Sequence, residues 1–138
     1  MKIQKGFTLV ELMIVVVVIA ILASIGIPAY NDHVIRGKLV EGTSALSDAR
    51  VKMEQYFQDN RTYDAGGGNT CPPAIPATTA NFTYACSNLT ATTYIITATG
   101  TGNLSAFSYA INQNNTKSSA TPWGNGATCW VMKNGETC

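Results

Sequence analysis

The sequence predicts an α+β fold in which one long N-terminal helix packs against an antiparallel sheet of about four strands. Three observations lead to this prediction. An uncharged and mostly apolar run of 19 residues extends from Leu12 to Tyr30. A helical stripe of apolar or small residues follows it, and short alternating segments rich in Thr, Tyr and Ile come after that. Because the chain has 138 residues, we expect a single small head domain after the apolar run.

The run lies within a predicted transmembrane helix, residues 7–30, which is long enough to cross a bilayer because crossing takes about 20 residues. Lys2 and Lys5 precede it, so the positive-inside rule places the N-terminus in the cytoplasm and the later residues outside it. Glu11 stands at the mouth of the run. A carboxylate there costs about 2.5 to 3.5 kcal/mol on insertion scales, which indicates a partner or a function. The alternative is a solvated residue at the membrane interface.

A second helical stretch covers residues 31–60. Its apolar or small positions recur at steps of four and three: Ile35, Leu39, Gly42, Leu46, Ala49, Met53 and Tyr56. Charged residues occupy the other face, where pairs such as Asp48 and Lys52 stand four apart and support a helix. The two stretches together predict one helix from about Phe7 to about Asn60. Gly26 and Pro28 interrupt the pattern, so a kink or a local unwinding point is expected there.

The helical pattern ends at three glycines, 66–68, and a Pro-rich loop leads into the rest of a β-sheet head formed by residues 61–138. Strands are predicted where residues alternate between two faces: Phe82 to Cys86, Thr93 to Thr99, Ala106 to Asn112 and Thr128 to Lys133. The segment 99–103 contains two glycines and predicts a turn between the second and third strands.

Four cysteines, Cys71, Cys86, Cys129 and Cys138, all follow the apolar run, and none belongs to a Cys-x-x-Cys pair of the kind used in zinc ribbons and redox motifs. Two disulfides are therefore expected, which indicates an oxidising compartment. Proximity along the chain favours Cys71 with Cys86 and Cys129 with Cys138. The other two pairings remain open.

The sequence contains no pattern that favours catalysis, a metal or a cofactor. The one histidine, His33, lies among polar residues just past the apolar run, and the thiols are expected to be oxidised, which leaves no nucleophile with a base beside it. Trp130 on a predicted strand is expected in the core, whereas Trp123 in a loop is the better candidate for contact with a partner. A net charge of +1 offers little attraction for DNA.

The first 30 residues resemble the type IV prepilin signature, because the string Lys5-Gly6-Phe7-Thr8-Leu9-Val10-Glu11-Leu12 precedes a long apolar helix. The resemblance implies the type IV pilin fold and a leader peptide, residues 1–6. It also implies that prepilin peptidase cuts between Gly6 and Phe7 and methylates the new amine of Phe7. Glu11 of one subunit would then pair with that amine in its neighbour and set the register of assembly.

Three further segments resemble PilE-type minor pilins of Gram-negative type IV pilus systems. They are Tyr56 to Tyr63, Tyr109 to Asn115, and the ending that runs from Cys129-Trp130-Val131 to Cys138. The resemblance implies a non-enzymatic minor subunit that supports pilus assembly, twitching motility, adhesion or DNA uptake. Its implied partners are other pilins through their N-terminal helices, prepilin peptidase, the assembly machinery and the inner membrane, with the head in the periplasm until the filament becomes extracellular.

Three alternative functions follow from the same leader. A DNA-receptor minor pilin of the competence type should carry a basic stripe, and the nearly neutral head argues against DNA as a partner. A pseudopilin of a type II secretion system is disfavoured by the two expected disulfides and the ending. A major pilin shares the leader and often a C-terminal disulfide.

Overall fold

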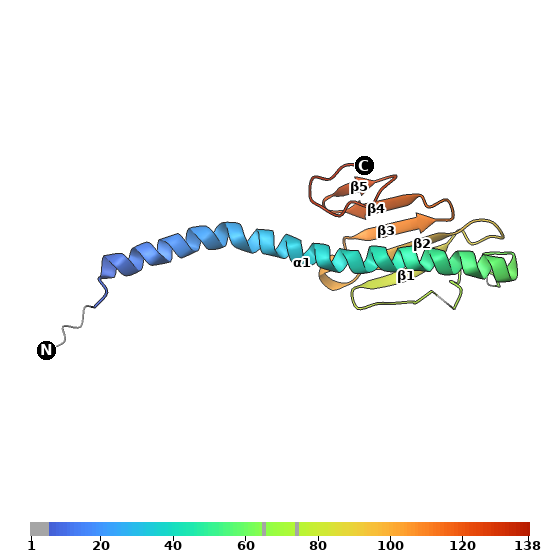
Figure 1. Cartoon of the computed structure of the whole chain (residues 1–138), viewed down its shortest axis with the longest axis horizontal. Coiled ribbons are helices and arrows are strands. Elements are labelled where there is room, and N and C mark those ends of the chain that lie inside the picture. The colour runs from blue at the N-terminus through green and yellow to red at the C-terminus, as the bar shows by residue number, and fades with distance from the viewer. Residues whose placement is uncertain (1–5, 65, 74) are drawn as a thin grey trace. The chain divides into compact units, whose positions relative to one another are not determined.

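The computed structural model describes residues 6–64, 66–73 and 75–138, and the chain divides into two compact units, residues 1–35 and 36–138. Helix α1 (Leu9–Asn60) is assigned without a break over 52 residues (Figure 1). It ends at the predicted residue and begins two residues later than predicted. Gly26 and Pro28 lie inside it, so the described chain has no unwound segment there. The unwinding point stays a prediction about a subunit that leaves the membrane.

The part of α1 that belongs to the second unit buries the predicted stripe against the sheet (Figure 1). Six of its residues are buried: Leu39, Gly42, Thr43, Leu46, Ala49 and Met53. Thr43 is the polar member of this set, and its hydroxyl donates to the carbonyl of Leu39 at 3.2 Å, so burial leaves it hydrogen-bonded. The flanking stripe positions, Ile35 and Tyr56, are half-buried.

Five strands form one antiparallel sheet in the order β1-β2-β3-β4-β5, each paired with its neighbour in the chain. Their bounds are β1 (Phe82–Ser87), β2 (Ile95–Gly100), β3 (Ser108–Asn112), β4 (Lys117–Thr121) and β5 (Gly124–Gly126), with a 3₁₀ turn at Gly102–Leu104. The face toward α1 carries large side chains such as Phe82, Ile96 and Tyr109, all buried. The first three strands confirm the predicted ones with bounds that differ by one or two residues.

The fourth predicted strand, 128–133, is wrong, and the sheet has two strands that were not predicted. β4 contains Ser118, Ser119 and Ala120, and β5 is Gly124-Asn125-Gly126. Neither segment is rich in β-branched or aromatic residues, so propensity does not mark them. Backbone pairing to β3 makes β4 a strand, and β4 in turn pairs with β5.

The segment 128–133 crosses the inner face of the sheet instead, and side chains rather than a strand partner satisfy its backbone. The N–H of Val131 donates to Ser119 Oγ at 3.0 Å, and the carbonyl of Val131 accepts from the Tyr109 hydroxyl at 3.0 Å. Val131 is fully buried. The expected burial of an apolar side chain in this segment is therefore confirmed. Its backbone, however, bonds to side chains and not to a neighbouring strand.

The connection between α1 and β1 is attached to the helix by Glu41. Its carboxylate accepts from the backbone N–H of Asn81 at 3.2 Å and from the Asn81 amide at 2.5 Å. Hydrogen bonds from Thr79 first and then Asn81 lower the pKa of Glu41, against a smaller opposing effect of burial. Because these donors favour the charged form, Glu41 stabilises the start of β1 while it is ionised.

We expect Glu41→Gln to destabilise the head by about 1–2 kcal/mol at neutral pH, because the amide cannot accept at both positions. A pKa lowered by folding contributes stability above the unfolded value of about 4.3, and the contribution is lost as the pH falls through the folded pKa. Thermal unfolding of the full chain in neutral micelles, followed by circular dichroism at pH 7 and in acid, measures both effects.

The matched control is Asp59→Asn, because Asp59 is an exposed carboxylate on the same helix with no hydrogen bond in the described part of the chain. It should leave stability unchanged at either pH. Equal unfolding temperatures for wild type and Glu41→Gln at neutral pH would contradict the role assigned to Glu41.

Candidate functional site

The described chain starts with an exposed segment before the helix. Gly6 and Phe7 precede α1, and the Phe7 side chain is 82% exposed. An exposed backbone outside regular secondary structure is what a peptidase needs at its cleavage point. The arrangement is compatible with the predicted cut between Gly6 and Phe7, which stays a prediction.

Thr8 forms the N-terminal cap of α1. Its hydroxyl oxygen accepts from the backbone N–H of Glu11 at 3.2 Å, and its carbonyl accepts from the N–H of Leu12 at 3.2 Å. Thr8-x-x-Glu11 has the spacing of a capping box, a signal that the sequence analysis missed. Glu11 therefore lies in the first turn, where the helix dipole favours a negative charge, and its side chain is exposed.

The residues after Glu11 form the apolar part of the first unit. From Leu12 to Ile27 every large apolar side chain is exposed, with between 48% and 71% of its surface free. In the described part of the chain, α1 is the helix that is long and apolar enough to cross a membrane. So large an exposed apolar surface requires lipid or other protein around it.

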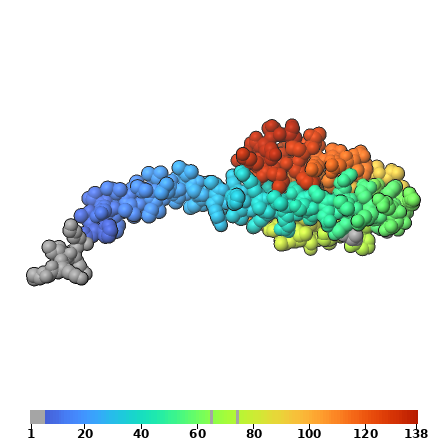
Figure 2. Space-filling view, viewed as in Figure 1, coloured from blue at the N-terminus to red at the C-terminus, as the bar shows by residue number. Residues whose placement is uncertain are grey.

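Two disulfides join the cysteines in the pairing that proximity favoured, Cys71 with Cys86 and Cys129 with Cys138. The first attaches the α1–β1 connection to β1, where Cys86 is buried. The second closes the C-terminal loop, residues 129–138, which forms part of one side of the head together with β4 and β5 (Figure 2, red). Among the described residues no cysteine is free.

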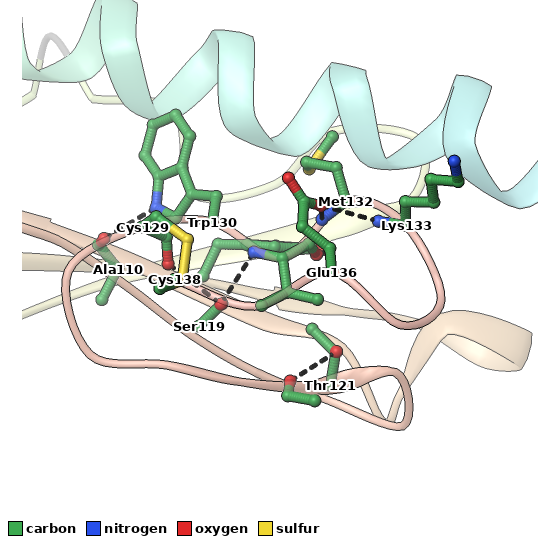
Figure 3. The surroundings of a disulfide bond; sticks show 12 residues. Ala110, Ser119, Thr121, Cys129, Trp130, Met132, Lys133, Glu136 and Cys138 are labelled. Atoms are coloured by element: carbon green, nitrogen blue, oxygen red, sulfur yellow. Dashed lines mark hydrogen bonds between the residues drawn. A yellow bond between two sulfur atoms is a disulfide. The ribbon is translucent and has the colours of Figure 1, made fainter.

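The C-terminal loop is ordered by Glu136. One of its carboxylate oxygens accepts from the backbone N–H groups of Met132 at 2.7 Å and Lys133 at 3.0 Å (Figure 3). Trp130 is half-buried and does not lie on a strand, so its predicted place in the core is wrong. Its indole N–H donates to the carbonyl of Ala110 at 2.9 Å, and Lys117 Nζ lies 4.6 Å from the ring centroid.

Trp123, the predicted partner contact, lies in the turn between β4 and β5. Its ring packs edge-on against Phe107, with 5.0 Å between the centroids, and leaves the residue half-exposed. The strand register places this turn at the end of the sheet where β3 begins, whereas Lys117 and Trp130 lie toward the end where β3 finishes. The two tryptophans therefore do not form one patch.

Among the residues that the structure describes, no three His, Cys, Asp or Glu side chains are grouped in a way that could hold a metal ion. His33 is exposed on α1. The functional features of the described chain are thus surfaces: the N-terminal segment with its apolar helix, and the polar exterior of the head.

The helix-and-sheet architecture defines the class of protein, because it is that of a type IV pilin. A crystal structure of the non-core minor pilin PilV of Neisseria meningitidis superposes on the chain with a TM-score of 0.57, covering 72% of this chain and 99% of PilV. Identity over this match is 15%, so the likeness shows the fold alone. The predicted fold class is confirmed, with five strands in place of about four.

Curated relatives match a shorter part of the chain. Type IV major fimbrial protein FimA of Dichelobacter nodosus is 51% identical over 58 residues, which are 42% of this chain and 36% of that protein. Another FimA from the same species is 43% identical over 77 residues, or 56% of this chain and 44% of that one. The chain therefore spans less than half the length of these relatives.

Two protein families match adjacent parts of the sequence. The prokaryotic N-terminal methylation motif matches residues 1–27. The family described as "Type IV minor pilin ComP, DNA uptake sequence receptor" matches residues 28–129, which include all five strands. The chain belongs to this family of type IV minor pilins.

Proposed function

We propose that this chain is a minor subunit of a type IV pilus, made as a precursor whose first six residues are removed by prepilin peptidase. The capped start of α1, the exposed segment before it and the match to the N-terminal methylation motif support this proposal. Before assembly the apolar helix holds the chain in the inner membrane with its head in the periplasm. In the filament the same helix packs against those of other pilins.

Cleavage gives Glu11 a partner. The new positive amine of Phe7 lies four residues before the Glu11 carboxylate, so each subunit carries both charges at one end of its helix. The Glu11 of an incoming subunit pairs with the amine of a neighbour. A buried ion pair adds little net stability, but a charge buried without its partner is strongly unfavourable, so the pairing sets register.

We further propose that the head binds DNA, and the observation that carries this proposal is the family match over residues 28–129. Charge alone does not favour DNA, because residues 36–138 contain seven basic and six acidic side chains. Two cations are nevertheless available on the C-terminal side of the head. Within the described residues Lys52 pairs with Asp48 at 2.9 Å, whereas Lys117 and Lys133 have no carboxylate partner.

Lys117 and Lys133 are suited to contact phosphates. Lys117 is held over the Trp130 ring, and Lys133 belongs to the loop that Glu136 and the Cys129–Cys138 disulfide order. Ordering before binding reduces the entropy lost on binding. Two phosphate contacts predict weak attraction to DNA and an affinity that depends only weakly on salt. Each contact contributes about one unit to the slope of log affinity against log salt concentration.

We expect the double variant Lys117→Gln, Lys133→Gln to weaken binding of duplex DNA and to reduce the salt slope by about two units. The measurement is fluorescence anisotropy with the full chain in neutral micelles over a salt series. Lys52→Gln is the matched control, because it removes the same charge from a lysine already paired with Asp48. Wild-type affinity and slope in the double variant would show that DNA does not bind this side of the head.

A further inference from the structure

A cleft of about 410 Å³ opens at the end of the sheet that carries the β1–β2 connection and the β3–β4 turn. It lies between the β1–β2 connection, with Asn88, Thr90 and Thr93, and the end of β3, with Asn112 and Gln113. Its volume is within the range of small-ligand sites, roughly 300–1,000 Å³. Among the described residues that line it, none is charged. Neither Lys117 nor Lys133 lines the cleft, although Lys117 begins β4 beside the end of β3.

The two amides at the end of β3 have orientations set by the fold. Gln113 Oε1 accepts from the backbone N–H of Tyr94 at 3.2 Å. Asn112 Oδ1 accepts from the N–H groups of Asn114 at 3.0 Å and Thr116 at 2.9 Å. Because a backbone N–H can only donate, the oxygen of each amide must face it. The NH₂ groups are left without a hydrogen-bond partner in the described part of the chain, and both can donate to a ligand.

The opposite wall is ordered before any ligand binds. Thr90 Oγ accepts from the backbone N–H groups of Thr92 at 3.2 Å and Thr93 at 3.0 Å. The Thr93 hydroxyl donates to the carbonyl of Asn88 at 2.9 Å and lies 2.8 Å from the Thr90 hydroxyl. The Asn88 side chain is exposed beside them and can both donate and accept. Tyr94, fully buried, and Ile95 supply the apolar part of the lining.

The chemistry of this lining selects a ligand class. A phosphate or carboxylate group is held most strongly by the charged donors Arg and Lys, and the described lining has neither. A saccharide presents neutral hydroxyl and ring oxygens that accept from amide NH₂ groups, and hydroxyl hydrogens that donate to an amide oxygen. Its C–H faces pack on apolar side chains such as Ile95. We propose that this cleft binds a neutral saccharide.

Two isosteric variants test the donors without disturbing the fold. Gln113→Glu keeps an oxygen for the N–H of Tyr94, and Asn112→Asp keeps one for Asn114 and Thr116, while each replaces the free NH₂ group with an oxygen. Asn125→Asp adds the same charge at an exposed position on β5, outside the cleft. It is the matched control.

The experiment is saturation-transfer NMR of the full chain in neutral micelles with a panel of neutral oligosaccharides built from glucose, galactose, mannose and N-acetylglucosamine. We expect at least one to bind with a dissociation constant below about 10 mM. Affinity should fall roughly fivefold to tenfold in Gln113→Glu and in Asn112→Asp, and should be unchanged in Asn125→Asp.

Two results would overturn the proposal. One is the absence of binding by every member of the panel at about 10 mM. The other is equal saccharide affinity in wild type and both cleft variants. If the same two variants also lost binding to duplex DNA, the cleft would be assigned to DNA. The double variant Lys117→Gln, Lys133→Gln tests the proposed DNA function separately, because neither lysine lines the cleft.

Discussion

Glu11→Ala should remove this chain from assembled pili while leaving its synthesis, membrane insertion and cleavage intact. The reason is the N-terminal amine of the neighbouring subunit, which is left in the filament core without its counter-charge when Glu11 is absent. Breaking a buried pair in this way costs about 3–5 kcal/mol, enough to exclude a subunit from the growing filament. Mass spectrometry of sheared pili and of the membrane fraction measures the effect through the peptide that starts at methylated Phe7.

Glu11 also lies in the capped first turn of α1, so the experiment must separate charge from capping. Glu11→Gln keeps the length of the side chain and removes the charge, and it should fail to assemble like Glu11→Ala. Thr8→Ala removes the hydroxyl that accepts from the Glu11 N–H, at about 0.5–2 kcal/mol, and should still assemble. Normal assembly of Glu11→Gln, or equal failure of Thr8→Ala, would show that capping and not the ion pair is what assembly requires.

Gly42→Ala should destabilise the head even though alanine favours a helix more than glycine does. A Cβ on Gly42 would lie 2.8 Å from two carbon atoms of the Phe82 ring. That ring is fully buried, so it can shift only by displacing the side chains packed around it. Overpacking of this kind costs about 1–3 kcal/mol and outweighs the gain in helix propensity of about 1 kcal/mol. Thermal unfolding of the full chain should show a lower midpoint.

Gly37→Ala is the matched control, because Gly37 belongs to the same helix and an added Cβ there meets no atom within 4 Å among the described residues. It should stabilise the head by about 0.5–1 kcal/mol. Opposite signs for the two substitutions would establish that Gly42 is needed for contact between α1 and β1. A rise in the midpoint for both would mean that the helix and Phe82 can separate without loss.

Local patterns in the sequence were sufficient to predict much of this protein's fold. The charge-free run, the stripe from Leu39 to Met53 and the neighbouring cysteines predicted α1, its buried face and both disulfides. Each of these depends on residues close together in the chain, where helix periodicity and loop closure act. The spacing of Thr8 and Glu11 was visible in the same way and was missed.

The candidate sites on the head depended on contacts between distant residues. Strand register places Trp123 and Trp130 at opposite ends of the sheet. The NH₂ groups of Asn112 and Gln113 are free because backbone N–H groups bond to the oxygens of these amides. The amide that orients Gln113 belongs to Tyr94, 19 residues away. A sequence lists both residues but does not say that they meet.

The sequence by itself determined that this chain is an apolar helix joined to a disulfide-bonded β head, because hydrophobic periodicity and cysteine spacing are local properties. Only the tertiary structure decided that Ser118-Ser119-Ala120 would be a strand and that 128–133 would not. Residues 118–120 form a strand because their backbone pairs with β3. The backbone of Val131 bonds instead to the side chains of Ser119 and Tyr109, so its segment is not a strand. Pairing across the sheet outweighs the weak intrinsic preference of short polar segments.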